Sequence, residues 1–398
     1  MRKRKKYFLL LALGCIPSIV FAQSLLTEED AILAAVKNSY VLNAANLKVK
    51  SQQKLQGVAF NLANPDITIE SPTAEFMTVG VMQSFEFPTV YYRQGKLLQQ
   101  QTQLTKKEME LIHLEVIQNV KLAYLQAQYS MALINQLGIQ DSLFNGIAKS
   151  MQRLFDAGQI DFIAKTYAST QYGDVHNKFL QAQMDANFAY FQLQLITGRE
   201  DSLRVSPMQP ILSADQQILQ NDSLSAQGSV FNQYYEQTKS ISLNEWKLEK
   251  NKALPGFSFG YMNQGPKNSE IPFRLRAGIN IPIWFWQYRA TIKSAKLKVE
   301  YTDQQVKAQQ RNLHSKMQQA KVEVMKSQQA LNYYSERGLK ESDDIISSTQ
   351  RMLTAGVSDY VTYLRTLSEA YAIRLNSIEA TKNYNQSIIN LNYLIGNK

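Results

Sequence analysis

The chain has 398 residues, enough for two or three ordinary domains or for one extended repeat architecture. Much of its net charge of +10 comes from the basic segment 2–6, and no later cluster of basic residues is interleaved with aromatic ones, which argues against a nucleic-acid partner. The single cysteine, Cys15, lies in the N-terminal apolar run, so the remaining chain has no thiol for a disulfide or a metal site.

The sequence shows no grouping of residues typical of an enzyme. Its three histidines, His113, His176 and His314, each stand alone in a helical stretch, and there is neither a glycine-rich phosphate loop nor a nucleophile elbow. We therefore expect no catalytic residue, no metal site and no cofactor, and a protein that is not an enzyme.

Residues 1–22 have the pattern of a secretory signal peptide. Basic residues precede an apolar run, and Val20-Phe21-Ala22 offers a small-residue cleavage site. The alternative is lipidation at Cys15, since Leu13-Gly14-Cys15 loosely resembles a lipoprotein box. Both alternatives predict export, and no later stretch approaches the roughly 18 apolar residues of a membrane-spanning helix.

Residues 23–198 predict a first structural repeat. Thr27 can cap its first helix, and a change from helical to period-two alternation marks its hairpin. In chain order we expect a helix over 27–60, a β-hairpin over 65–88, a long helix from Tyr91 to a tip at 153–161, and a returning helix over 161–196.

Two rows of residues at heptad spacing run along the long helix, which predicts neighbours on two sides rather than one coiled-coil partner. One row holds Leu97, Leu104, Leu111 and Leu125, and the other holds Met109, Val116, Ala123 and Leu137.

Residues 230–398 predict a second repeat, joined to the first by a polar connector over 199–229. The expected elements are a helix from about 221 to 254, a β-hairpin over 255–283, a long helix to a tip at 351–359, and a returning helix over 359–395.

The two tips carry the clearest evidence of duplication. Arg153, Gly158 and Asp161 return 198 positions later as Arg351, Gly356 and Asp359, within a frame of Arg, three residues, Ala-Gly, two residues and Asp. Glycine turns a helix end at low cost because it adopts positive φ, and the aspartate suits the first turn of the returning helix. Each tip therefore predicts a tight turn between two antiparallel helices.

The strands predict where the molecule meets another surface. In each repeat, two short helices placed end to end match the length of the long one, with the hairpin at one end and the tip at the other. Four strands with one apolar face cannot close on themselves, and open edges cannot be tolerated in lipid. We expect a mainly α fold of long helical hairpins, with four strands per chain in a transmembrane β-barrel shared between copies; three copies would supply twelve strands. Aromatic residues at 284–288 suit the membrane interface.

The order of these features resembles the TolC-type outer-membrane efflux proteins over nearly the whole mature chain. The features that carry the resemblance are Leu26-Thr27-Glu28-Glu29-Asp30-Ala31-Ile32, the paired strand regions, the twin tips and Leu394-Ile395-Gly396. The resemblance implies a homotrimer with a shared trimeric transmembrane β-barrel in the outer membrane, whose helical hairpins form a periplasmic helical barrel. Its implied partners are outer-membrane lipid, a periplasmic adaptor and an inner-membrane RND-type pump. It assigns adaptor contact to the tip residues Arg153, Gly158, Asp161, Arg351, Gly356 and Asp359; the alternative is that Gly and Asp only shape and cap the turns.

The resemblance also directs attention to a constriction near the tips. Some members of the family close the tunnel with acidic residues six and nine positions after the second tip glycine, where this chain has Thr362 and Arg365. An aspartate ring is therefore not expected there. We expect the aromatic residues Phe162 and Tyr360 to narrow the opening instead.

The sequence also bears on what the protein exports. The stretch 83–91, Gln-Ser-Phe-Glu-Phe-Pro-Thr-Val-Tyr, is similar to the heavy-metal branch of the family, which predicts export of metal cations. The alternatives are a multidrug duct, or a periplasmic coiled-coil scaffold that is not a channel.

Overall fold

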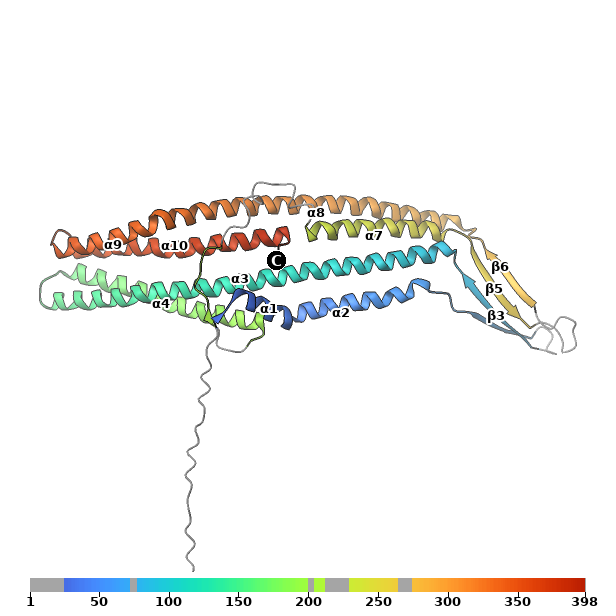
Figure 1. Ribbon diagram of the computed structural model, residues 1–398, viewed down its shortest axis with the longest axis horizontal. Coiled ribbons are helices and arrows are strands. Elements are labelled where there is room, and N and C mark those ends of the chain that lie inside the picture. The colour runs from blue at the N-terminus through green and yellow to red at the C-terminus, as the bar shows by residue number, and fades with distance from the viewer. Residues whose placement is uncertain (1–24, 72–76, 200–203, 212–228, 264–273, 398) are drawn as a thin grey trace, which may run out of the picture.

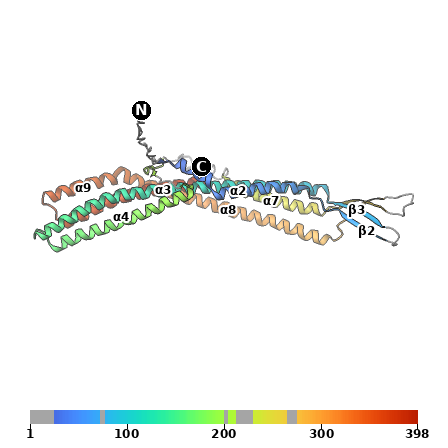
Figure 2. The same ribbon diagram turned by 90° about the horizontal axis from the view of Figure 1, so that it is seen from below.

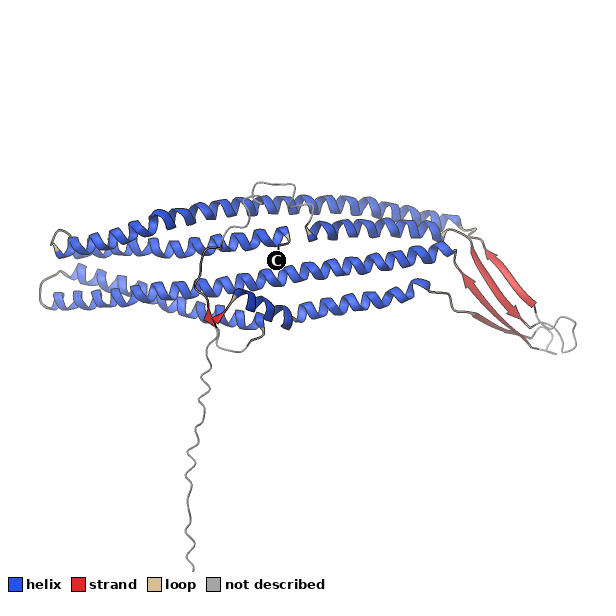
Figure 3. Cartoon of the chain, in the orientation of Figure 1, coloured by secondary structure: helices blue, strands red, loops and turns tan. Residues whose placement is uncertain are grey.

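The computed structural model describes residues 25–71, 77–199, 204–211, 229–263 and 274–397. The expected signal peptide, Cys15, the centre of the expected hairpin at 255–283 and the expected helix start near 221 lie outside these ranges. The described chain is a long bundle of helices with a small sheet at one end (Figure 1), and helices make up most of it (Figure 3).

The first repeat follows the expected order of elements. It contains β1 (Leu25–Leu26), α1 (Glu28–Asn38), α2 (Tyr40–Leu55), the 3-10 turn η1 (Gln56–Phe60), β2 (Asp66–Glu70), β3 (Thr78–Phe85), α3 (Pro88–Asp156) and α4 (Phe162–Thr197).

The rest of the chain repeats the order of helix, hairpin, long helix and returning helix, with a short strand in the connector and a π-helical turn in the long helix. It contains β4 (Arg204–Val205), α7 (Val230–Lys252), β5 (Gly256–Met262), β6 (Arg274–Asn280), α8 (Phe285–Tyr333), the π-helical turn η2 (Tyr334–Gly338), α9 (Leu339–Thr354) and α10 (Tyr360–Ile395).

The long helix α3 lies at the centre of the bundle. Its 69 residues span about 100 Å at 1.5 Å per residue. It contacts α1, α2 and α4 from its own repeat and α7 and α10 from the other, so the prediction of neighbours on two sides is confirmed. The short helices lie end to end along the long ones (Figures 1 and 2).

The prediction of one helix over 27–60 is wrong in its middle. Ser39 adopts an extended conformation (ψ 114°) between α1 and α2, and its Oγ accepts a hydrogen bond of 3.2 Å from the N–H of Leu42. A serine that caps the following helix competes with continuation of the preceding one. Thr27 caps α1 as expected, accepting from the N–H of Asp30 at 3.1 Å.

The four main strands form one antiparallel sheet in the order β2-β3-β5-β6. Registers such as Ile67 with Val81, Val81 with Tyr261, and Tyr261 with Leu275 place apolar side chains on one face. The other face carries Asp66, Thr68, Glu70, Gly80, Ser84, Ser258, Gly260, Arg274 and Arg276, among others. Within the chain, β2 and β6 are left as open edges.

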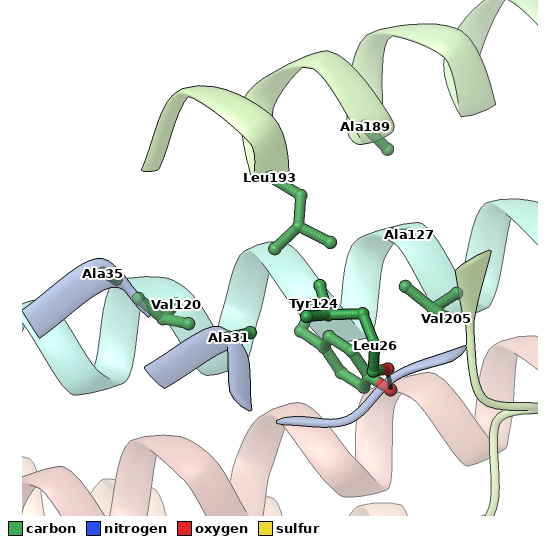
Figure 4. Packing of buried hydrophobic residues seen from close by; sticks show 9 residues of the cluster. All are labelled: Leu26, Ala31, Ala35, Val120, Tyr124, Ala127, Ala189, Leu193 and Val205. Atoms are coloured by element: carbon green, nitrogen blue, oxygen red, sulfur yellow. Dashed lines mark hydrogen bonds between the residues drawn. The ribbon is translucent and has the colours of Figure 1, made fainter. Parts of the chain in front are cut away.

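A second, two-stranded sheet is a feature that the sequence analysis missed. β1 pairs in parallel with β4, which lies inside the expected connector. Tyr124 on α3 lies beneath this pair and donates to the carbonyl of Leu26 at 2.8 Å, while its oxygen accepts from the N–H of Ser206 at 3.1 Å. Leu26 and Tyr124 belong to a buried cluster that joins β1 and β4 to α1, α3 and α4 (Figure 4). Its members are Leu26, Ala31, Ala35, Val120, Tyr124, Ala127, Ala189, Leu193 and Val205.

The connector is also fixed to the second repeat. The side-chain amide of Asn385, only 2% exposed on α10, accepts from the N–H of Ile211 at 2.8 Å and donates to the carbonyl of Gln209 at 2.7 Å. One strap, residues 204–211, therefore ties the middle of α3 to the C-terminal third of α10.

Asn385→Leu is expected to destabilise the protein by about 1–3 kcal/mol. Leucine has a similar volume but offers no hydrogen bond to the N–H of the half-buried Ile211 or to the carbonyl of the exposed Gln209. Each hydrogen bond lost costs about 0.5–1.5 kcal/mol. Denaturant unfolding followed by circular dichroism measures the change. Asn376→Leu, at an exposed position of the same helix, is the control, and equal losses in both variants would contradict the role of the strap.

None of the described helices combines the length and the apolar character that a membrane-spanning helix needs.

Candidate functional site

Both expected tips are tight turns with the same geometry. Gly158 has φ +72° and Gly356 has φ +71°, the left-handed conformation that favours glycine. In each turn the residue after the glycine closes a six-residue ring: Gln159 donates to the carbonyl of Leu154 at 2.9 Å, and Val357 donates to that of Met352 at 3.0 Å. This is the hydrogen bonding of a Schellman motif, and it confirms the predicted turn.

The tip aspartates cap the returning helices. Asp161 Oδ1 accepts from the N–H of Ala164 at 2.7 Å, and Asp359 Oδ1 accepts from that of Thr362 at 2.8 Å. Hydrogen bonds from the backbone and side chain of Thr362 hold the pKa of Asp359 below its ordinary value. The capping alternative therefore has a direct structural basis, and adaptor contact by the aspartates stays a prediction.

The tip arginines are exposed and have no carboxylate partner among the described residues. Arg153 donates to Ser150 Oγ at 3.3 Å, and Arg351 donates to Ser348 Oγ at 3.4 Å. Both serines lie one helical turn before the arginine, so the guanidinium groups are held near the helix surface while most of their donors remain available. This arrangement suits contact with a second protein.

One buried cluster joins the two tip hairpins. It contains Phe144 and Met151 from α3, Ala168 and Val175 from α4, and Tyr363, Leu364, Leu367 and Tyr371 from α10. Ile346 and Leu353 of α9 pack against it. The tips, 198 positions apart in sequence, therefore form one packed end of the molecule.

The four predicted constriction residues differ in how they are placed. Phe162 is 62% exposed and stacks edge-on with Phe155, with a ring distance of 6.1 Å. Tyr360 packs against the cluster that joins the tips. Thr362 donates its hydroxyl to Asp359 at 2.8 Å, and Arg365 lies 3.3 Å from Glu369 in an exposed ion pair.

In the part of the chain that the structure describes, no group of three or more histidine, cysteine or acidic side chains is placed to hold a metal ion. His176 is not isolated in space, however, because its Nδ1 lies 2.8 Å from Asp141 Oδ1 across α3 and α4.

The opposite end of the molecule exposes an apolar sheet face. Among its side chains, Ile67 is 67%, Phe259 58% and Leu275 81% exposed. Between the sheet and the helices, the exposed aromatic residues Trp284, Phe285 and Trp286 lie at the start of α8. Exposed apolar surface on this scale marks a surface that another molecule or a membrane covers.

Two helices also carry exposed apolar rows that the sequence analysis missed. On α4 the row is Leu180, Met184, Phe188, Phe191 and Leu195, and on α8 it includes Leu297, Tyr301, Val322 and Met325. The spacing on α4 keeps the side chains on one helix face. Helical periodicity predicts that a helix has an apolar face. It does not predict whether that face packs against the same chain or is left exposed.

The comparisons with known proteins agree with this architecture. Residues 257–397 match the family model described as outer membrane efflux protein, so the second repeat carries the sequence pattern of that family. Among curated protein sequences none matches the chain.

Several solved structures share the fold. One of them is CusC, whose structures concern folding and transmembrane channel formation. It has 15% identity and TM-score 0.78, and the match covers 93% of this chain and 92% of that one. The outer membrane protein VceC of Vibrio cholerae has 10% identity and TM-score 0.77, covering 93% and 96%. The CmeC outer membrane channel of Campylobacter jejuni has 13% identity and TM-score 0.76, covering 93% and 85%. The chain therefore has the fold of outer-membrane channels.

Proposed function

We propose that this chain is the outer-membrane channel of a tripartite efflux system, a passive conduit without catalysis. The observation that carries the proposal is that the two ends of the molecule present different surfaces. One end exposes an apolar sheet face with two open edges, and the other, about 100 Å away along α3, presents twin capped turns with exposed arginines. The family match and the shared fold support it.

The proposed assembly is a homotrimer. The open edges β2 and β6 run antiparallel to each other, so β6 of one copy can pair with β2 of the next, and three copies supply twelve strands for a β-barrel with a lumen. The exposed rows on α4 and α8 give the helices a second surface for the same neighbours.

Membrane fractionation followed by recording in planar bilayers tests the channel. The mature chain is expected in the outer membrane and, once purified, to form trimers that conduct ions. Recovery of the chain in the soluble periplasm would favour the coiled-coil scaffold and reject the channel.

In this proposal the tip arginines and glycines contact a periplasmic adaptor, which connects the channel to an inner-membrane RND-type pump. Arg153→Glu together with Arg351→Glu reverses two exposed charges without touching the turn. Site-specific cross-linking from Gln159 to co-expressed periplasmic adaptors measures the contact, which is expected to fall at least tenfold in the double variant.

Alanine at Phe162 is expected to raise single-channel conductance, because its exposed ring stands at the proposed tunnel opening. Tyr360→Ala is expected to raise it less, since Tyr360 already packs against the cluster that joins the tips. Single-channel conductance of each variant, measured in the same bilayer, tests whether these rings narrow the tunnel. Unchanged conductance in both would reject the aromatic constriction.

The proposed cargo is heavy-metal cations, on the similarity of residues 83–91, with multidrug export as the second candidate. CusC and CmeC both share the fold at similar identity, so the fold does not distinguish the two. Growth of a deletion strain on copper, zinc, cobalt, cadmium and several lipophilic drugs separates them. Sensitivity to drugs with unchanged metal tolerance would reject the metal assignment.

A further inference from the structure

Positive charge is concentrated in the helices next to the sheet. Helices α2 and α7 with the first 25 residues of α3 and α8 hold 16 Lys and Arg against 7 Asp and Glu. The helical residues of the rest of the bundle, which lie toward the tips, hold 16 Lys and Arg against 15 Asp and Glu. The net charge of these helices therefore lies almost entirely beside the sheet, which points to an anionic partner at that end.

The charge is densest where the helices meet the sheet. Residues 86–96, 246–256 and 281–293 hold seven basic side chains against two acidic ones, Glu86 and Glu249. The same three segments, here named the cation–aromatic belt, hold the aromatic residues Phe87, Tyr91, Tyr92, Trp246, Trp284, Phe285, Trp286 and Tyr288.

Three of the cations lie over aromatic rings. Lys250 Nζ is 3.8 Å from the ring centre of Trp246, Arg289 Cζ is 5.0 Å from that of Phe285, and Arg93 Cζ is 5.7 Å from that of Tyr92. Among the described residues none of these three cations has an ion pair. A ring contact steadies the side chain and leaves its charge unneutralised and available for an anion.

The belt lies at the depth of lipid headgroups if the apolar sheet face is in lipid. At 1.5 Å per residue, all seven basic residues lie within about 12 Å of the sheet-side ends of α3, α7 and α8. The exposed Ile279 of β6 is followed by the exposed Ile281 and Ile283. These residues lead from the apolar sheet face directly to Phe285 and Arg289 at the start of α8. The headgroup layer begins where the roughly 30 Å hydrocarbon layer ends.

We propose that the cation–aromatic belt binds the headgroups of anionic phospholipids in the leaflet nearest the helices, and selects them over zwitterionic ones. This inference rests on the proposed outer-membrane location. Arginine and lysine bind phosphate oxygens, and aromatic rings favour the boundary between headgroup and acyl chain. Each basic side chain near an anionic surface strengthens binding by about fivefold, whereas a zwitterionic headgroup carries no net charge to attract it.

The test compares bound lipids. Full-length protein is equilibrated in detergent micelles with equal amounts of phosphatidylglycerol and phosphatidylcholine of the same acyl chains, separated by gel filtration, and its lipids are counted by mass spectrometry. The wild-type protein is expected to retain at least fivefold more phosphatidylglycerol, and added salt is expected to lower that ratio by screening.

The variant Arg93→Gln, Lys250→Gln, Arg289→Gln is expected to lose this preference at least fivefold. The control Lys149→Gln, Lys340→Gln, Lys382→Gln removes the same charge from the tip side and is expected to keep it. Conductance in planar bilayers shows that each variant is folded. If the belt variant yields no channel, the salt dependence of the wild-type ratio decides instead.

Three outcomes overturn the inference: a wild-type ratio near one, an equal loss in the control, or changed ion selectivity of the belt variant with an unchanged lipid ratio. The last outcome would place the cations toward the lumen. A protein that conducts but shows no lipid preference rejects this inference alone, whereas a protein found in the soluble periplasm rejects the proposed function.

Discussion

Replacing both Gly158 and Gly356 with valine is expected to leave cells as sensitive to the exported compounds as a strain that lacks the chain. Both residues have φ near +70°, where a β-branched side chain clashes with its own backbone and costs more than the roughly 1–2 kcal/mol of an ordinary residue. The turns would have to open, which would move the aspartate caps and the arginines together. Growth on the cargo and cross-linking to the adaptor measure the loss.

Asparagine at the same two positions separates the shape of the turn from its contacts. Asparagine tolerates positive φ, and a Cβ built at either glycine has no neighbouring atom within 4 Å, so the turn has room for it. If the glycines serve only the turn, the asparagine variant exports normally. If the adaptor approaches the bare backbone, the asparagine variant folds but loses cross-linking. Normal export by the valine variant would contradict both alternatives.

The sequence was informative where local chemistry decides the structure. Positive φ at Gly158 and Gly356 and helix capping at Asp161 and Asp359 depend on the residue and its immediate neighbours, so their spacing predicted both turns. The strand alternation likewise placed apolar and polar side chains on opposite faces of β2, β3, β5 and β6. Both signals recur in the second repeat, which made each of them stronger.

The same reasoning failed where contacts between segments far apart in the sequence determine the structure. A two-residue strand such as β1 has no periodicity to detect, and its partner β4 lies 179 positions further along the chain. The hydroxyl of Tyr124 and the side-chain amide of Asn385 form their hydrogen bonds with backbone groups far away in the sequence, including those of the connector, so the sequence alone does not identify their partners. Ser39 could have been found as a helix cap, because serine favours that place, but the apolar pattern continues through it.

The candidate site likewise has parts that the sequence predicts and parts that it does not. The turns and the caps were predictable, but the cluster that joins the two tip hairpins was not, because it brings residues of both repeats together. The charge of the belt was also hidden. The basic N-terminal segment masks it in the overall count, and only the sheet shows which helix ends lie together. The functional surfaces therefore depend on the arrangement of the repeats more than on any motif.

Phe144→Ala is expected to lower the stability of the tip end by about 3–5 kcal/mol, the usual cost of removing a buried phenylalanine. Phe144 is 1% exposed, and its ring lies edge-on to Tyr371 of α10 at 6.3 Å. Because this cluster joins the two tip hairpins, the cavity should let them separate while the sheet end stays intact. Amide hydrogen exchange of α9 and the first half of α10 is expected to rise at least 100-fold, since each 1.4 kcal/mol corresponds to about tenfold in the opening equilibrium.

Ile139→Ala on the same helix is the matched control. Ile139 is 57% exposed, so its loss is expected to change stability by less than about 0.5 kcal/mol and to leave exchange at the tips unchanged. An equal effect at Ile139 would mean that another copy of the chain covers that face and that stability at the tips comes from the assembly. An effect confined to Phe144 means that each chain joins its own two tips, so that they would meet the proposed adaptor as one preformed surface.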